Sequence, residues 1–165
     1  MNIHPLVVHF PIAFLSLYAV LECVRFRKVM DWAPFFYIKA TLLFAGVLGG
    51  VAAVLAGEQA EKLYGETRLT ELHASFGVVS VWIFGIIGLV YLIILLECLA
   101  DQVPEKWRAV SHAKVKIARW IYAHILWIVA FGGLVCVMIT GALGGALVYG
   151  PDVDPFVRVV VGLFK

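Results

Sequence analysis

The chain has 165 residues, of which 63% are hydrophobic and 15% are charged, and its mean hydropathy is +0.98. Soluble globular domains are less apolar and more charged, so this composition excludes an ordinary soluble protein. The length fits a single transmembrane domain over residues 1–165. The net charge of +2 carries no information about nucleic acid, because membrane topology accounts for the basic residues. The sequence has no basic and aromatic patch of the RNA-binding type, so we expect no nucleic-acid partner.

Four apolar stretches are long enough to cross a bilayer, which takes roughly 20 helical residues. They cover residues 5–24, 33–56, 72–99 and 117–148. In lipid each backbone polar group must be satisfied within the segment, so these stretches are predicted to be helices. We therefore predict an all-α, integral membrane four-helix bundle with up-down-up-down topology.

The basic residues predict how the bundle is oriented. Nine of the thirteen lie in the connections after the first and third spans, if Lys39 is counted with the first connection and Arg119 with the third. By the positive-inside rule these connections face the cytoplasm, so both termini are predicted to lie outside.

The two halves of the chain are similar to each other. His9 opens a string with Ala13 and Ser16, and His73 opens a matching string with Gly77 and Ser80. Both strings run on to a Leu-Glu-Cys sequence, at residues 21–23 and 96–98. Residues 45–50 and 140–145 also match, so we predict a pseudo-two-fold repeat that relates helices 1–2 to helices 3–4.

The paired histidines suggest a cofactor. In an up-down bundle the first and third helices stand diagonally across the core, and His9 and His73 both lie near the outer ends. Residues 9, 13, 16, 20 and 23 follow helical spacing, as do residues 73, 77, 80, 84 and 88, and both stripes are predicted to point inward. Two imidazoles are the number that a bis-histidine haem requires.

We therefore predict a membrane-embedded b-type cytochrome, with one haem b held by His9 and His73 near the periplasmic face. It would exchange electrons with a periplasmic or membrane redox partner, as a carrier rather than a catalyst. No nucleophile-base pair or phosphate loop is evident in the sequence. The oligomeric state stays open, and a homo-oligomer is compatible with the sequence.

Other residues are assigned to the cofactor less directly. His4 is interpreted as a substitute ligand, a propionate partner or an interfacial residue, and Arg68 as a propionate partner or a solvated loop residue. Glycines in two clusters are expected to let a macrocycle edge approach the backbone, with close helix packing as the alternative. These are Gly46, Gly49, Gly50, Gly141, Gly144 and Gly145.

Two other functions are kept open. One is non-haem binding or transport of a divalent transition metal by His4, His9, His73 and Glu58. The other is a structural or assembly subunit. Glu22 and Glu97 are expected to reach the inner interface, and without a partner residue neither is interpreted as part of a proton path.

Two motifs resemble a known family. Residues 3–13, Ile-His-Pro-Leu-Val-Val-His-Phe-Pro-Ile-Ala, and residues 140–150, Thr-Gly-Ala-Leu-Gly-Gly-Ala-Leu-Val-Tyr-Gly, are similar to the bacterial predicted membrane proteins of DUF2231. The resemblance covers essentially the whole chain. It implies a four-helix, multi-pass domain of the bacterial inner (cytoplasmic) membrane, and it implies no particular activity.

Overall fold

The computed structural model describes residues 7–64, 67–97 and 105–164, and all regular secondary structure in those ranges is helical. The predicted all-α class is therefore confirmed. The helices are α2 (His9–Glu22), α3 (Arg27–Met30), α4 (Ala33–Tyr64), α5 (Arg68–Glu97), α6 (Glu105–His124), α7 (Leu126–Tyr149) and α8 (Pro155–Gly162).

Among the described residues, three helices are long and apolar enough to cross a membrane. They are α5, α7 and the Ala33–Ala60 part of α4. The α2 helix is also apolar but has only 14 residues. The predicted second and third spans thus coincide with α4 and α5, and the chain is a multi-pass membrane protein.

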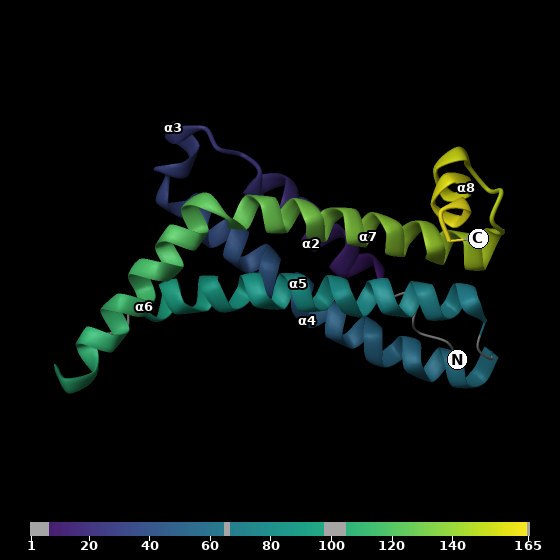
Figure 1. Ribbon diagram of the computed structural model, residues 1–165, viewed down its shortest axis with the longest axis horizontal. Helices are drawn as coiled ribbons and strands as arrows, with labels where there is room; N and C mark the ends of the chain where they lie inside the picture. The colour runs from purple at the N-terminus through teal and green to yellow at the C-terminus, as the bar shows by residue number, and fades with distance from the viewer. Residues whose placement is uncertain (1–6, 65–66, 98–104, 165) are drawn as a thin grey trace.

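The fourth predicted span is wrong at its beginning. Residues 117–148 do not form one helix, because α6 ends at His124 and α7 begins at Leu126, with Ile125 at φ −113° between them. Figure 1 shows α6 leaving the direction of α7 at the same end of the molecule as α3. Within residues 117–124 the basic side chains of Arg119 and His124 interrupt the apolar residues, so this stretch continues the amphipathic α6 and not the uniformly apolar α7.

The long helices pack around a core of buried apolar and aromatic side chains. Helix α5 contacts α4 and α7, and α2 also contacts α4 and α7; α5 and α7 run side by side in Figure 1. The core of this region includes Leu15, Tyr18, Leu43, Phe84, Ile87, Tyr91 and Ala130.

The chain ends with the short helix α8, which packs against α7 at the end of the molecule opposite α3 (Figure 1). Asp154 begins it by accepting a hydrogen bond from the Val157 backbone N–H, with Pro155 in the first turn. Val157, Val160 and Val161 are buried in one cluster with Ala142, Leu143 and Ala146 of α7. The two ends of the molecule therefore differ, with α8 at one and the basic α3 and α6 at the other.

Candidate functional site

A buried ion pair lies inside the helices, toward the α3 end. Glu22 and Lys39 are both 0% exposed, and the Lys39 Nζ lies 2.8 Å from the Glu22 Oε2. The Tyr91 hydroxyl donates a hydrogen bond of 2.6 Å to the same carboxylate oxygen. Helices α2, α4 and α5 thus each contribute one polar side chain, and we call these three residues the buried charge site.

Arg25 connects this site to the surface. Its Nη2 donates to the Glu22 Oε1 at 3.2 Å, and its Nη1 donates to the Tyr122 carbonyl oxygen at 3.4 Å. The Arg25 side chain is 27% exposed, whereas Glu22 and Lys39 are not exposed at all. Both carboxylate oxygens of Glu22 therefore have cationic partners, and Arg25 is the partner that water can reach.

Aromatic rings surround the Lys39 ammonium. Its Nζ lies 4.9 Å from the centre of the Phe35 ring, 4.7 Å from that of Tyr122 and 6.0 Å from that of Tyr91. The contact with Glu22 lacks the angles of a hydrogen bond, so the attraction is mainly electrostatic. The charged ammonium is thus stabilised by one carboxylate and by cation–π contacts.

The polar cluster ends at Tyr18, one turn from Glu22 on α2. The Tyr18 ring packs edge-on against Tyr91 at 5.9 Å and against Phe84 at 6.0 Å, measured between ring centres. Its buried hydroxyl forms no hydrogen bond within the described residues. Leu15, Phe84 and Ile87 continue the core beyond it, whereas the partly exposed Arg25 contacts Glu22 from the side of the α2–α3 connection.

The sequence pattern did not predict this site, for an identifiable reason. Lys39 is assigned above to the first connection, although it lies six residues after the start of the predicted span 33–56. That assignment is wrong, because the Lys39 side chain is buried in α4. Glu22 was expected at the interface, and it is instead fully buried. An ionisable residue within an apolar span is the signal that could have identified the pair.

The inward stripe predicted for the first helix is also wrong. His9, Ala13, Val20 and Cys23 are exposed, and the buried face carries Pro11, Leu15, Tyr18, Ala19 and Glu22. The helix turns its carboxylate into the protein, where it meets Lys39 and Tyr91, and its Tyr18 ring packs there against Phe84 and Tyr91. On α5 the predicted stripe is confirmed, because Ser80, Phe84 and Gly88 are buried and His73 and Gly77 are half-buried.

His73 is held by α7. Its Nδ1 lies 2.9 Å from the Thr140 carbonyl oxygen. A Cβ atom added at Gly144 would lie 3.0 Å from the His73 Cε1, so the ring occupies the space that this glycine leaves. Because His9 is exposed and His73 is half-buried, the structure does not bring the two rings to equivalent inward positions.

The other predicted glycines mostly pack helices together. A Cβ at Gly46 would lie 2.5 Å from the Leu15 Cδ2, one at Gly49 would lie 3.2 Å from the Pro11 Cδ, and one at Gly50 would lie 2.9 Å from the Val81 Cγ2. At Gly145 the nearest atom would be the Val157 Cγ2 at 3.7 Å, and at Gly141 there is no atom within 4 Å. Close helix packing, the alternative interpretation of these clusters, therefore explains Gly46, Gly49 and Gly50.

The remaining predicted ligands do not converge. His4 lies outside the described residues, while Arg68 and Glu58 are exposed at the start of α5 and on α4. Within residues 7–64, 67–97 and 105–164, no group of three or more His, Cys, Asp or Glu side chains is arranged to hold a metal ion. The haem itself stays an untested prediction.

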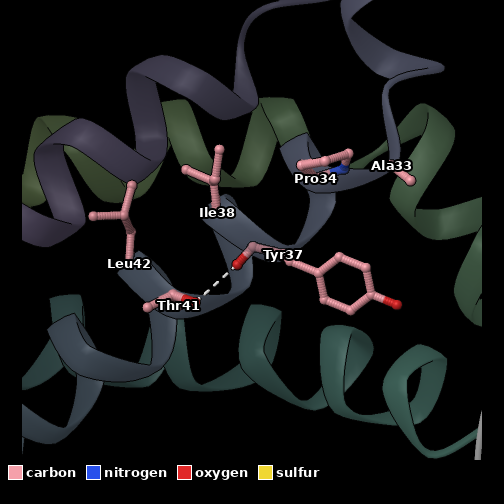
Figure 2. Close-up of a pocket in the computed structure, with 6 residues that line it drawn as sticks. All are labelled: Ala33, Pro34, Tyr37, Ile38, Thr41 and Leu42. Carbon is pink, nitrogen blue, oxygen red and sulfur yellow. Dashed lines mark hydrogen bonds between the residues drawn. The ribbon is translucent and has the colours of Figure 1, made fainter.

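A shallow groove on α4 is the other surface feature near this end. Ala33, Pro34, Tyr37, Ile38, Thr41 and Leu42 line it. Figure 2 shows that all six belong to the first turns of α4, with the Thr41 hydroxyl donating to the Tyr37 carbonyl oxygen at 2.9 Å. The groove is open and almost entirely apolar, so it offers no reactive group.

Comparison with protein families matches residues 1–154 to the predicted membrane proteins of DUF2231. The chain belongs to the DUF2231 family. The predicted family is thereby confirmed, and the match extends over the buried charge site. Comparisons with curated proteins and with solved structures gave no match.

Within this DUF2231 protein the two Leu-Glu-Cys sequences serve different purposes. Glu22 is buried with Lys39, whereas Glu97 is 30% exposed and accepts a hydrogen bond of 3.1 Å from the Arg119 Nε. The two Leu-Glu-Cys sequences therefore hold one buried and one partly exposed carboxylate. This difference provides a matched control for every experiment on Glu22.

Proposed function

We propose that this membrane protein takes up and releases a proton at Glu22, as a proton-relay component of the membrane. One observation carries the proposal: the Glu22 carboxylate is fully buried among apolar helices, 2.8 Å from Lys39 and 2.6 Å from the Tyr91 hydroxyl. Ionisable groups inside membrane spans are expensive to maintain, and they commonly mark ion and proton pathways.

The chemistry follows from the partners of the carboxylate. Arg25 and Lys39 face Glu22 as cations, and Tyr91 and Tyr122 are the phenols of the packed helices α5 and α6. A proton from water forms an O–H bond on Glu22 and neutralises it. The site then holds two cations without their shared anion, so the contacts of Arg25 and Lys39 with the carboxyl group weaken.

Arg25 indicates the side from which the proton arrives. Its guanidinium remains protonated in proteins, so it orients the carboxylate and does not pass the proton itself. Water reaching its exposed edge delivers the proton. Beyond Tyr18 the core is apolar, so exchange with the other side of the membrane requires a rearrangement of the helices or a partner protein.

A structural role for the ion pair is the competing explanation, and a double variant separates the two. Replacing a buried ion pair by apolar residues is often neutral or stabilising, whereas removing one member is costly. We expect Glu22→Met with Lys39→Met to unfold near the wild-type temperature. After an acid jump in proteoliposomes, this variant should take up fewer protons per chain than wild type.

The experiment has a clear opposing result. If the double variant and wild type take up equal numbers of protons, the ion pair only holds the helices together and the relay proposal is wrong. Glu97→Gln is the matched control. It should lower proton uptake only by the protons that the partly exposed Glu97 carboxyl group itself binds.

We further propose that α2 completes an up-down-up-down bundle with α4, α5 and α7, in which the two halves are related by the sequence repeat. The contacts of α2 with both α4 and α7 support this arrangement. With Lys39 buried, eight basic residues remain on the α3 and α6 side against four on the other. This bias supports a cytoplasmic location for α3 and α6, in the inner membrane of a bacterium.

Haem or metal binding at His73 is a second candidate, and one observation favours it. Donation from the Nδ1 to the Thr140 carbonyl oxygen selects the tautomer with a lone pair on Nε2. Metal-binding histidines typically use this arrangement. An absorption spectrum of protein purified from haem-replete cells tests it: a Soret band that disappears in His73→Ala supports haem b, and a metal-free, colourless protein contradicts both haem and metal binding.

A further inference from the structure

Helix α6 has a composition unlike that of the other long helices. Residues 105–124 include five Lys or Arg residues and a single acidic residue, Glu105. The helix leaves the direction of α7 and extends from the α3 end of the molecule (Figure 1). A basic helix of this kind, interrupted by apolar residues, is typical of segments that lie at a membrane surface.

The side chains of α6 divide into a packed face and an exposed face. Val115 and Ala118 are buried, and α6 contacts α5 and, less extensively, α7. On the exposed side Ile117 is 60% and Trp120 is 56% exposed. Two large apolar side chains are therefore largely exposed on this basic helix, with the Trp120 ring stacked on that of His124.

Two lysines accompany these exposed apolar residues. Lys114 and Lys116 are exposed, and in the described part of the chain neither forms an ion pair. Arg119, in contrast, is paired with Glu97. The exposed surface of α6 thus combines uncompensated positive charge with an aliphatic and an indole side chain, and we call Lys114, Lys116, Ile117 and Trp120 the α6 surface.

We propose that the α6 surface binds the anionic headgroups of the adjacent membrane leaflet. Lys114 and Lys116 contact lipid phosphates, while Ile117 and Trp120 insert at the boundary between headgroups and acyl chains. The charge of the surface is complementary to that of an anionic leaflet, and tryptophan favours this depth of the bilayer. The proposal does not depend on proton transfer at Glu22.

Hydrogen exchange of the full-length protein in lipid nanodiscs tests this proposal. The discs contain either phosphatidylcholine alone or phosphatidylcholine with added phosphatidylglycerol. We expect the amides of residues 113–121 to exchange several-fold more slowly in the anionic discs, with no change for α5. Lys114→Gln with Lys116→Gln should remove this difference, and native mass spectrometry should show fewer retained phosphatidylglycerol molecules.

The control is Lys28→Gln, which removes an exposed lysine from α3 at the same end of the molecule. It should preserve the slower exchange of α6 in anionic discs. Equal exchange in both kinds of disc would overturn the proposal, as would an equal loss of the effect in the Lys28 variant. Slower exchange caused by inorganic phosphate in phosphatidylcholine discs would identify a free-anion site and also overturn it.

Discussion

The Lys39 ammonium lies 2.8 Å from the Glu22 carboxylate, and neither side chain has any exposed surface. The pair joins α4 to α2, and the Tyr91 hydroxyl connects both to α5. Burial of two charges costs several kcal/mol per ion, which is recovered only when geometry and further hydrogen bonds are favourable. The hydrogen bonds from Tyr91 and Arg25 and the rings around Lys39 supply that compensation.

Removing one member of the pair should destabilise the protein strongly. We expect Lys39→Met to lower the free energy of unfolding by about 3–5 kcal/mol, because it leaves a buried carboxylate with only part of its cationic environment. Chemical denaturation in detergent measures the change. A cost below about 1 kcal/mol would show that Glu22 is neutral or solvated in the native protein.

The second Leu-Glu-Cys position should behave differently. Glu97→Gln breaks a partly exposed pair with Arg119, so we expect a cost below about 1 kcal/mol that decreases further at high salt. The same denaturation assay with and without added salt checks it. A cost equal to that of Glu22→Gln would mean that the two halves are energetically equivalent after all.

The Tyr91 hydroxyl offers a milder test of the same site. Tyr91→Phe keeps the ring contacts and removes the hydrogen bond to Glu22, so we expect a loss of about 1.5–3 kcal/mol, the range for hydrogen bonds to charged groups. Thermal unfolding measures it. Tyr37→Phe, in the exposed groove of α4, is the control and should leave the transition unchanged.

Two glycines that the sequence treats as equivalent should respond differently to alanine. Gly46→Ala drives a methyl group into Leu15, and we expect a loss of about 1–3 kcal/mol from overpacking. Gly141→Ala meets open space and should be neutral or slightly stabilising, because alanine is the better helix former. Unfolding midpoints that rank the two variants in the opposite order would contradict the helix packing described here.

The sequence predicted where the long helices lie better than it predicted which face of each helix is buried. Long apolar runs identified α4, α5 and most of α7, because burial in lipid requires them. Hydropathy could not reveal that one helix ends and another begins at Ile125, because apolar residues continue through this position. Only the basic residues of α6 indicate that it is a separate helix.

The sequence pattern could not show which face of α2 is buried, and the reason is physical. In a membrane both faces of a helix are apolar, so small residues such as Ala13 do not reveal which face is inside. The side chains that determine the buried face are Glu22, whose carboxylate needs partners on other helices, and Tyr18, whose ring packs against rings of α5. Those partners, Lys39 and Tyr91, are distant in sequence, so only the fold brings them together.

Infrared difference spectroscopy tests the proton relay most directly. Wild-type protein, Glu22→Gln and Glu97→Gln are each cycled between acidic and neutral pH in lipid vesicles. The infrared band of protonated carboxyl groups is then compared among the three proteins. We predict a buried-carboxyl band that is present in wild type and in Glu97→Gln and absent in Glu22→Gln. An unchanged band in Glu22→Gln would contradict proton binding at this residue.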